Sequence, residues 1–324
     1  MKSIYPLRLK PFTKSVIWGS DILINKYNKQ TDSYNIGESW ELSCRVKEQS
    51  KIINGMYAGK SLNEYISIHG NAVIGKNYNG DRFPLLIKLL SSSAPLSVQV
   101  HPDDDYSLKN EGEYGKTEMW YIIDCDTDSE LVLGVNDYDK EAFLRAANSG
   151  TLERYLRKCT VKPGDCYFIP AGLVHAMGKG ILLYEVQQNS DVTYRVYDYN
   201  RIDKDGSKRE LHTEKALEVI YEYTDSEINA LANAKKLSIK VSENAETLIS
   251  SDKFTVEKMV LDASDELICT EESFLSLTVT KGECEIEYDS DIYPANTGET
   301  YFIPAGLGSF KIHGKAEILC SSIK

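Results

Sequence analysis

The sequence has 324 residues, of which 42% are hydrophobic and 27% are charged. The length argues against a peptide hormone or a disulfide-stapled mini-domain, and the proportions are typical of a globular chain and argue against wholesale disorder. Lys plus Arg number 37 and Asp plus Glu number 49, so the net charge is −12. That charge argues against binding to a nucleic-acid backbone through the overall field, although a local cationic pocket remains compatible with it.

Cysteine usage and the apolar runs indicate the compartment. The seven cysteines are odd in number and form no C-x-x-C pair, which argues against a disulfide framework and a thiolate zinc finger. Residues 1–6 lack a secretory apolar segment, and no apolar run approaches the ~20 residues that a membrane-spanning helix needs. We therefore expect a cytoplasmic protein without a membrane segment.

Short strands dominate the pattern along the chain, because apolar and β-branched runs alternate with Gly, Pro, Asn and Asp. The strand candidates before residue 237 are 85–90, 96–101, 117–123, 165–169, 181–188 and 192–199. After about residue 237 the strand pattern returns and continues to the end of the chain. The pattern predicts a mainly β fold.

Helical patterns are few. Residues 61–65 suggest a capped turn or short helix, and residues 139–158 suggest one or two helices broken at Gly150. Residues 212–223 suggest a further helix with Thr213 as its N-cap. Residues 226–236 are polar and rich in Ala and Asn, which indicates a linker or a weak helix.

An internal repeat is the most informative feature. Residues 164–175 read GDCYFIPAGLVH and residues 298–309 read GETYFIPAGLGS, with eight identities at equal offsets. A strand, a Pro-Ala-Gly turn and a returning strand explain this pattern, because Pro fixes φ and Gly permits a tight reversal. We therefore predict two copies of one β-barrel domain, in residues 1–235 and 236–324. His175 ends the first copy and has no counterpart in the second.

Candidate metal ligands lie on three of the predicted strands of the first copy. Gln99 and His101 are one residue apart, so both side chains face the same side of their strand. Glu118 and His175 lie on two other strand candidates. Two His and one Glu form a known catalytic zinc set that leaves a position for water or substrate. Each residue alone would more often be structural. We expect structural or surface roles for the remaining histidines, which are His69, His212 and His313.

Several motifs carry a resemblance to a known family. The spacing Gly164-x5-Pro170-x-Gly172-x2-His175 resembles the second motif of the cupin superfamily, which hosts many chemistries. Four further stretches read GESWE at 37–41, SVQVHP at 97–102, KTEMW at 116–120 and EVQQNSDVTYR at 185–195. In this order they resemble the class I mannose-6-phosphate isomerases in their short bacterial form, and the similarity covers essentially the whole chain.

The resemblance implies two cupin-type β-barrel (jelly-roll) domains with a few short helices, and one zinc ion per chain in the first domain. The implied zinc ligands are Gln99, His101, Glu118 and His175. The second domain, residues 236–324, would carry no metal ligands.

The resemblance also implies roles around the metal. Arg195 falls on the residue assigned to catalysis, and the further catalytic candidates are Lys116, Glu185 and Asp191. The substrate-binding candidates are Ser97, Lys88 and Arg201. Arg201 occupies a position that is often Lys in the family, which keeps the charge but changes the donor geometry.

The implied reaction interconverts mannose 6-phosphate and fructose 6-phosphate by moving a proton between C1 and C2 through an enediolate. A divalent ion would stabilise the oxyanion, and a base within hydrogen-bond reach would take the proton. The candidates for that base are Lys116, Glu185, Asp191 and a metal-bound water. Arg195 offers a rigid charged fork that suits the phosphate or the oxyanion better than proton abstraction.

Other functions compete with this hypothesis. Iron(II) prefers two His and one carboxylate, so His101, Glu118 and His175 would also serve a metal-dependent cupin such as a dioxygenase. A non-catalytic sugar-binding cupin is a second alternative, and a purely structural role is a third. Neither a nucleic acid nor a membrane is an expected partner.

Overall fold

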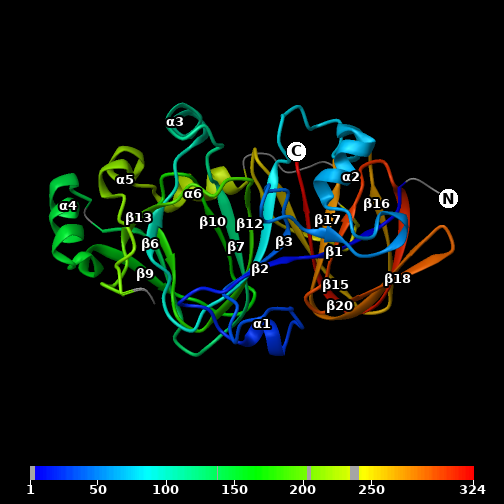
Figure 1. The fold of residues 1–324 in the computed structure, drawn as a ribbon, viewed down its shortest axis with the longest axis horizontal. Coiled ribbons are helices and arrows are strands. Elements are labelled where there is room, and N and C mark those ends of the chain that lie inside the picture. Colours follow the sequence, from blue (N-terminus) through cyan, green and yellow to red (C-terminus); the bar gives the residue numbers. More distant parts are fainter. Residues whose placement is uncertain (1–3, 137, 203–205, 234–240) are drawn as a thin grey trace.

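The computed structural model describes residues 4–136, 138–202, 206–233 and 241–324. Within these ranges the chain is mainly β, as predicted, and its strands form three sheets. Figure 1 shows the green strands of the middle of the chain in one half of the molecule and the orange and red C-terminal strands in the other half.

Two sheets build the first half. The six-stranded sheet has the order β10 (Cys166–Ile169), β7 (Glu118–Cys125), β12 (Ile181–Gln188), β5 (Leu85–Ser91), β3 (Glu38–Leu42), β2 (Phe12–Lys14). The five-stranded sheet has the order β13 (Tyr194–Tyr197), β6 (Val98–Val100), β11 (His175–Met177), β8 (Glu130–Val135), β9 (Leu156–Thr160).

The third sheet builds the second half. Its order is β14 (Glu246–Ser250), β15 (Thr255–Leu261), β20 (Gly308–Ser322), β17 (Leu275–Tyr288), β19 (Thr300–Ile303), β1 (Leu7–Lys10), β4 (Lys51–Ile52). Off this path, β16 (Ser264–Cys269) pairs with β20 and β18 (Asp291–Asn296) pairs with β17. Two N-terminal strands therefore complete the sheet of the C-terminal half. The predicted boundary at 235/236 lies outside the described residues.

The six-stranded sheet is buried on both faces. Alternation along β12 sends Tyr184 into a core that also contains Phe302 of β19, and Leu183 into a core that also contains Met177 of β11. All eight residues of β12 are buried, so the strand shows no alternation between buried and exposed positions. The sheet therefore packs against the C-terminal half on one side and against the five-stranded sheet on the other.

Six α-helices lie in the described residues, at α1 (Ile22–Asn25), α2 (Leu62–His69), α3 (Asp104–Asn110), α4 (Lys140–Ser149), α5 (Thr213–Val219) and α6 (Asp225–Ala232). Short 3₁₀ turns occur at η1 (Gly55–Tyr57), η2 (Asn71–Val73) and η3 (Leu152–Tyr155). Among the described helices, none is both long and apolar enough to cross a membrane.

The helix expectations need two corrections. Helix α4 ends at a left-handed Gly150, as predicted, but residues 156–158 belong to strand β9 because they pair with β8. The N-cap of α5 is His212, whereas Thr213 is the first helical residue and is buried. Helix α6 forms in the segment predicted as a linker or weak helix, because Thr224 and Glu227 build a reciprocal capping box at its start.

The twelve-residue repeat has the predicted structure in both copies. The first copy forms β10, a turn and β11, and the second forms β19, a turn and the start of β20. Gly172 and Gly306 have φ of 90° and 76°, a left-handed conformation that favours glycine. His175 is buried in the first copy, whereas Ser309 is exposed in the second.

A buried ion pair joins the N-terminal residues to the C-terminal half. Lys29 Nζ lies 2.6 Å from Glu41 Oε1, and both side chains are at most 5% exposed. Lys29 also donates to the Gly298 carbonyl, and Thr300 of β19 donates to Glu41 Oε2 at 3.3 Å. The pair therefore satisfies polar groups of both halves at once.

Replacing Lys29 with Met should destabilise the protein strongly, because the Glu41 carboxylate would stay buried without its cation. We expect a loss of about 3–5 kcal/mol in the free energy of unfolding, measured by urea denaturation. Lys26→Met is the matched control, since Lys26 pairs with Asp124 at 3.8 Å with both side chains more than half exposed. The control should change stability by less than about 1 kcal/mol. Equal losses in the two variants would contradict the role of the buried pair.

Candidate active site

Strand pairing brings the predicted metal ligands together. His175 at the start of β11 lies directly opposite Gln99 in β6, and His101 follows the last residue of β6. Glu118 is the first residue of β7 in the facing six-stranded sheet. The set therefore lies between the two sheets of the first half, at the ends of their strands.

The three charged or ionisable members are in contact. Glu118 Oε1 lies 3.2 Å from His175 Nε2, and Glu118 Oε2 lies 3.5 Å from His101 Nε2. One potential ligand atom from each residue lies within 4.8 Å of the others. Gln99 adds its amide nitrogen at 3.3 Å from His175 Nε2. This spacing suits a single ion.

Hydrogen bonds to the backbone orient both imidazoles. His101 Nδ1 donates to the Val192 carbonyl at 2.9 Å, and His175 Nδ1 donates to the Leu173 carbonyl at 2.8 Å. The proton of each ring is thereby assigned to Nδ1 by its partner. Both Nε2 atoms then present a lone pair toward Glu118, as metal-binding histidines do.

Unpaired polar atoms test whether the residues fit a cation. His101 Nε2 and both carboxylate oxygens of Glu118 are buried without a hydrogen bond from any described residue. Lys116 Nζ is within ion-pair distance of Glu118 Oε2, at 3.2 Å, but without hydrogen-bond geometry. A buried unsatisfied group costs about 1–3 kcal/mol. A divalent cation would satisfy all three atoms at once, so the residues fit a metal.

Protonation states favour the same conclusion. Burial, reinforced by the Lys116 charge, lowers the pKa of His101 well below its ordinary 6.5. Burial alone would raise the pKa of Glu118, but its polar surroundings, with the Lys116 charge first among them, hold that pKa well below 4.5. A neutral imidazole and an ionised carboxylate are the forms that bind metals.

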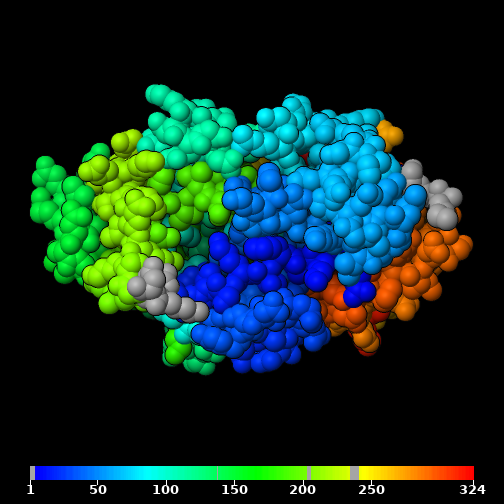
Figure 2. All heavy atoms as spheres, in the orientation of Figure 1, coloured from blue at the N-terminus to red at the C-terminus, as the bar shows by residue number. Residues whose placement is uncertain are grey.

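A cavity of about 350 Å³ opens beside this set. Its lining residues are Lys14, Val16, Trp18, Glu38, Lys88, Leu90, Leu96, Ser97, Gln99, Lys116, Trp120, Glu185, Asp191, Thr193, Arg195 and Arg209. Figure 2 shows the surface hollowed between the blue N-terminal segment and the yellow-green segment that contains β13 and α5. Gln99 and Lys116 both line the cavity and contact the buried ligand set, so the cavity leads to that set.

A buried ion pair crosses the cavity wall. Lys88 of β5 lies directly opposite Glu185 of β12, and their charged atoms are 2.9 Å apart. Glu185 Oε1 also accepts a hydrogen bond from Trp120 at 2.9 Å. Burial lowers the pKa of Lys88, but the charges of Glu185, Glu38 and Asp191 outweigh it and raise that pKa above its ordinary value. Lys88 therefore stays an ammonium donor.

Arg195 is fixed from two sides. Its Nε donates to Ser97 Oγ at 3.3 Å, and its Nη1 donates to the Glu210 carbonyl at 2.7 Å. Burial, together with the charge of Arg209, lowers the pKa of Arg195 from its ordinary value. The predicted residue Arg201 is not in the cavity lining and donates to the Pro95 carbonyl and to Asp198.

Sequence reasoning assigned no role to several cavity residues, which are Lys14, Trp18, Glu38 and Arg209. Glu38 lies in the GESWE stretch, and this motif was the only sequence feature that pointed to the residue. Its carboxylate accepts a hydrogen bond from Trp40. Lys14 and Arg209 lie in segments without strand or helix periodicity, and only the fold brings them to the cavity.

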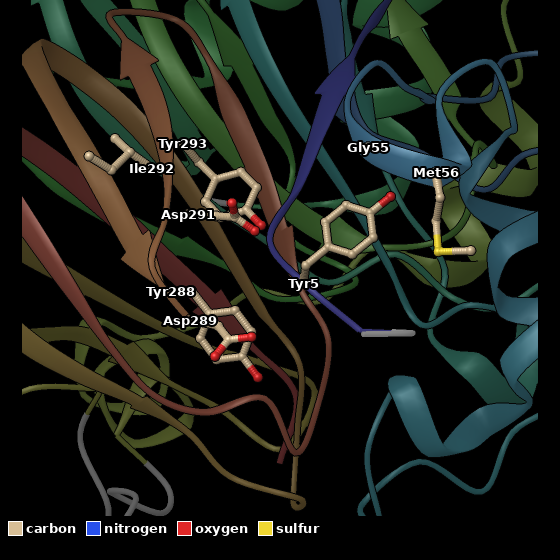
Figure 3. A pocket seen from close by; sticks show the side chains of 8 residues that line it. All are labelled: Tyr5, Gly55, Met56, Tyr288, Asp289, Asp291, Ile292 and Tyr293. Carbon is tan, nitrogen blue, oxygen red and sulfur yellow. The ribbon is translucent and has the colours of Figure 1, made fainter. Parts of the chain in front are cut away.

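A second pocket differs in its chemistry. It has about 460 Å³ and lies between Tyr5 and the β17–β18 hairpin (Figure 3). Its charged lining residues are Asp289 and Asp291, without Lys or Arg. A phosphorylated ligand would meet only negative charge there, so its greater size does not make it the site for an anion.

Replacing His175 with Ala should remove the metal, because one of two imidazole ligands is lost from a fully buried set. Elemental analysis of the purified variant should give a small fraction of the metal bound by the unchanged protein, since ligand loss weakens binding. His313→Ala is the control, because His313 is half-exposed and pairs with Glu287. Full metal content in His175→Ala would show that the ligand assignment is wrong.

Two family models match separate parts of the chain. A family model described as "Phosphomannose isomerase type I, catalytic domain" matches residues 7–146, and one described as "Mannose-6-phosphate isomerase, cupin domain" matches residues 244–323. Mannose-6-phosphate isomerase ManA of Bacillus subtilis is 40% identical over 321 residues, covering 98% of this chain and 99% of that protein. Mannose-6-phosphate isomerase of Streptococcus mutans is 36% identical, covering 98% of each.

A solved structure agrees with these sequence matches. The crystal structure of the mannose 6-phosphate isomerase from Bacillus subtilis superposes with a TM-score of 0.85 and 37% identity. The superposition covers 98% of this chain and 99% of that one, so the likeness extends over both halves of the molecule.

Proposed function

The chain belongs to the type I phosphomannose isomerase family, and from this premise we propose how its cavity carries out the reaction. The activity is the interconversion of mannose 6-phosphate and fructose 6-phosphate, an aldose–ketose isomerisation. The observation that carries the proposal is the set of unpaired buried atoms on His101 and Glu118 beside a cavity with several cations. Nothing in the comparisons favours a dioxygenase or a non-catalytic cupin.

We propose zinc as the metal, one ion per chain, with His101, Glu118 and His175 as ligands. Two imidazoles and one carboxylate are a donor set that zinc uses in catalytic sites. Gln99 is the fourth proposed ligand, and binding would require its amide to turn so that the oxygen faces the ion. When bound, zinc would act as a Lewis acid toward the oxygens at C1 and C2 of the sugar.

The proton moves between C1 and C2, and we propose roles around this step for three cavity residues: Lys116, Glu185 and Asp191. Glu185 accepts a hydrogen bond from Trp120 and pairs with Lys88, so its proposed role is to hold that ammonium in place. Lys116 is next to Glu118, and Asp191 lines the cavity without a hydrogen bond from a described residue. These two are the groups proposed to exchange protons with the substrate.

The cations of the cavity are proposed to bind the substrate's negative charge. Arg195 and Lys88 present fixed donors, and Ser97 supports Arg195 through its hydroxyl. Donors that are fixed in advance stabilise developing charge without reorganisation during the reaction. Arg201 is proposed to act indirectly, since its guanidinium is occupied by Pro95 and Asp198.

Metal removal tests the proposed function directly. The purified protein should contain about one zinc per chain, and a chelator should abolish conversion of mannose 6-phosphate to fructose 6-phosphate. Zinc should restore the rate of isomerisation. A parallel sample that receives iron(II) shows which of the two metals supports this rate. Full activity after complete metal removal would refute the metal-dependent mechanism, and stoichiometric zinc without isomerisation would refute the substrate.

Replacing Arg195 with Ala should lower kcat by about 100- to 1,000-fold, as expected for the loss of a fixed donor to developing charge. Metal content and thermal stability should stay close to those of the unchanged protein, since Arg195 contacts none of the proposed ligands through its guanidinium. Arg195→Lys should recover part of the rate, because it keeps the charge without the fork. Unchanged turnover in Arg195→Ala would remove Arg195 from the mechanism.

A further inference from the structure

We propose that Arg209 is a second guanidinium contact for the phosphate group of the substrate, and that Asp198 is the positioning residue that directs it into the cavity. This inference rests on the proposed function, because the anion is taken to be the 6-phosphate. Neither residue belongs to a motif that carries the family resemblance, and both emerge from the contacts around β13.

Backbone contacts place Arg209 beside Arg195. The segment that follows Arg209 runs along β13, because Arg195 Nη1 donates to the Glu210 carbonyl at 2.7 Å and His212 N donates to the Arg195 carbonyl at 2.7 Å. Arg195 N in turn donates to His212 Nδ1 at 3.2 Å. Arg209 and Arg195 both line the cavity, so a ligand in it meets the two guanidinium groups together.

Asp198 fixes the direction of Arg209. The carboxylate is 5% exposed, and its Oδ2 accepts from Arg209 Nε at 2.8 Å while its Oδ1 accepts from Arg209 Nη2. This two-point contact uses one edge of the planar fork and holds it in a single orientation. Arg209 Nη1 has no hydrogen-bond partner among the described residues and remains available to a ligand.

Arg201 supports the carboxylate from the other side. Tyr199 and Asn200 both have φ of 55°, a left-handed conformation that reverses the chain directly after Asp198. The reversal returns Arg201 to Asp198, where its backbone N–H donates to the Asp198 carbonyl at 3.0 Å and its Nη2 donates to Oδ1. Arg201 therefore holds the Asp198 carboxylate in place, whereas Arg209 lines the cavity.

The charge balance leaves this corner cationic. Asp198 is the buried carboxylate that meets both Arg201 and Arg209, and these two charges hold its pKa below the ordinary value although burial opposes that shift. The acidic lining residues are Glu38, Glu185 and Asp191, and all three interact electrostatically with Lys88. Arg195, Arg201 and Arg209 thus carry more positive charge than Asp198 cancels. A dianionic phosphate in this corner would restore the balance.

Kinetics of Arg209→Gln test the contact. KM for mannose 6-phosphate should rise about 10- to 100-fold, the effect of losing hydrogen bonds to a charged group. The fall in kcat should be smaller, and the inhibition constant of inorganic phosphate should rise in parallel with KM. Arg209→Lys should lie between the two proteins. Lys208→Gln is the matched control, because it removes one charge from the same segment at an exposed side chain that contacts Asn200.

A double-variant cycle tests the positioning role of Asp198. Asp198→Asn should raise KM while zinc content is retained. In the Arg209→Gln background the same change should add little, because both variants remove one interaction. A purely structural Asp198 would instead lower thermal stability and activity equally in both backgrounds. Additive KM effects would overturn the positioning role.

Direct binding separates this inference from the proposed function. Calorimetric titration of inorganic phosphate into the zinc-loaded protein reports the anion contact without turnover. Weaker binding in Arg209→Gln than in Lys208→Gln supports the contact, even if the unchanged protein fails to isomerise mannose 6-phosphate. Equal binding in the two variants would overturn it. A loss of binding in Arg201→Gln but not in Arg209→Gln would likewise overturn it.

Discussion

The ion pair between Lys88 and Glu185 is the interaction on which the rest of the site depends. It lies in the middle of two buried strands, where an unpaired charge would be very costly. Trp120 and Glu38 contact this pair, and their side chains line the cavity. The neighbouring strand β7, which pairs with β12, carries Glu118. Satisfying two charges inside the sheet thus organises both the Lys88 ammonium of the cavity and the approach to the proposed metal ligands.

The six-stranded sheet carries this charged pair on one face and is supported by packing on its opposite face. Alternation provides this support, because Met119, Tyr121 and Tyr184 enter a single apolar core with residues of the C-terminal half. The second half keeps an apolar interior of its own and presents Phe302 and Ser321 to the shared boundary. The C-terminal half therefore packs against and supports the sheet that carries the proposed site.

Local sequence patterns were enough to predict the parts of the structure that depend on short spacing. The repeat located both strand–turn–strand units, and period-two alternation placed Gln99 and His101 on one face of a strand. The positions of Asp198 and Arg209 could not be predicted, because their contact depends on a chain reversal at two non-glycine residues. Strand β9 was not predicted, because its formation depends on pairing with β8 and its own residue pattern does not indicate a strand. The proposed roles of the individual site residues remain predictions.

The pairing of β1 with β19 has a consequence for the order of folding. Leu7 lies opposite Phe302, so β1 can pair with β19 only after residue 302 has been synthesised, whereas its other neighbour β4 is made much earlier. Closing the long loop between β1 and β19 is slow. The strands that carry the proposed metal ligands can form before β19 exists, but the residues that support their sheet from behind are made later. The sheet that carries the proposed site therefore gains this support only after β19 has been made.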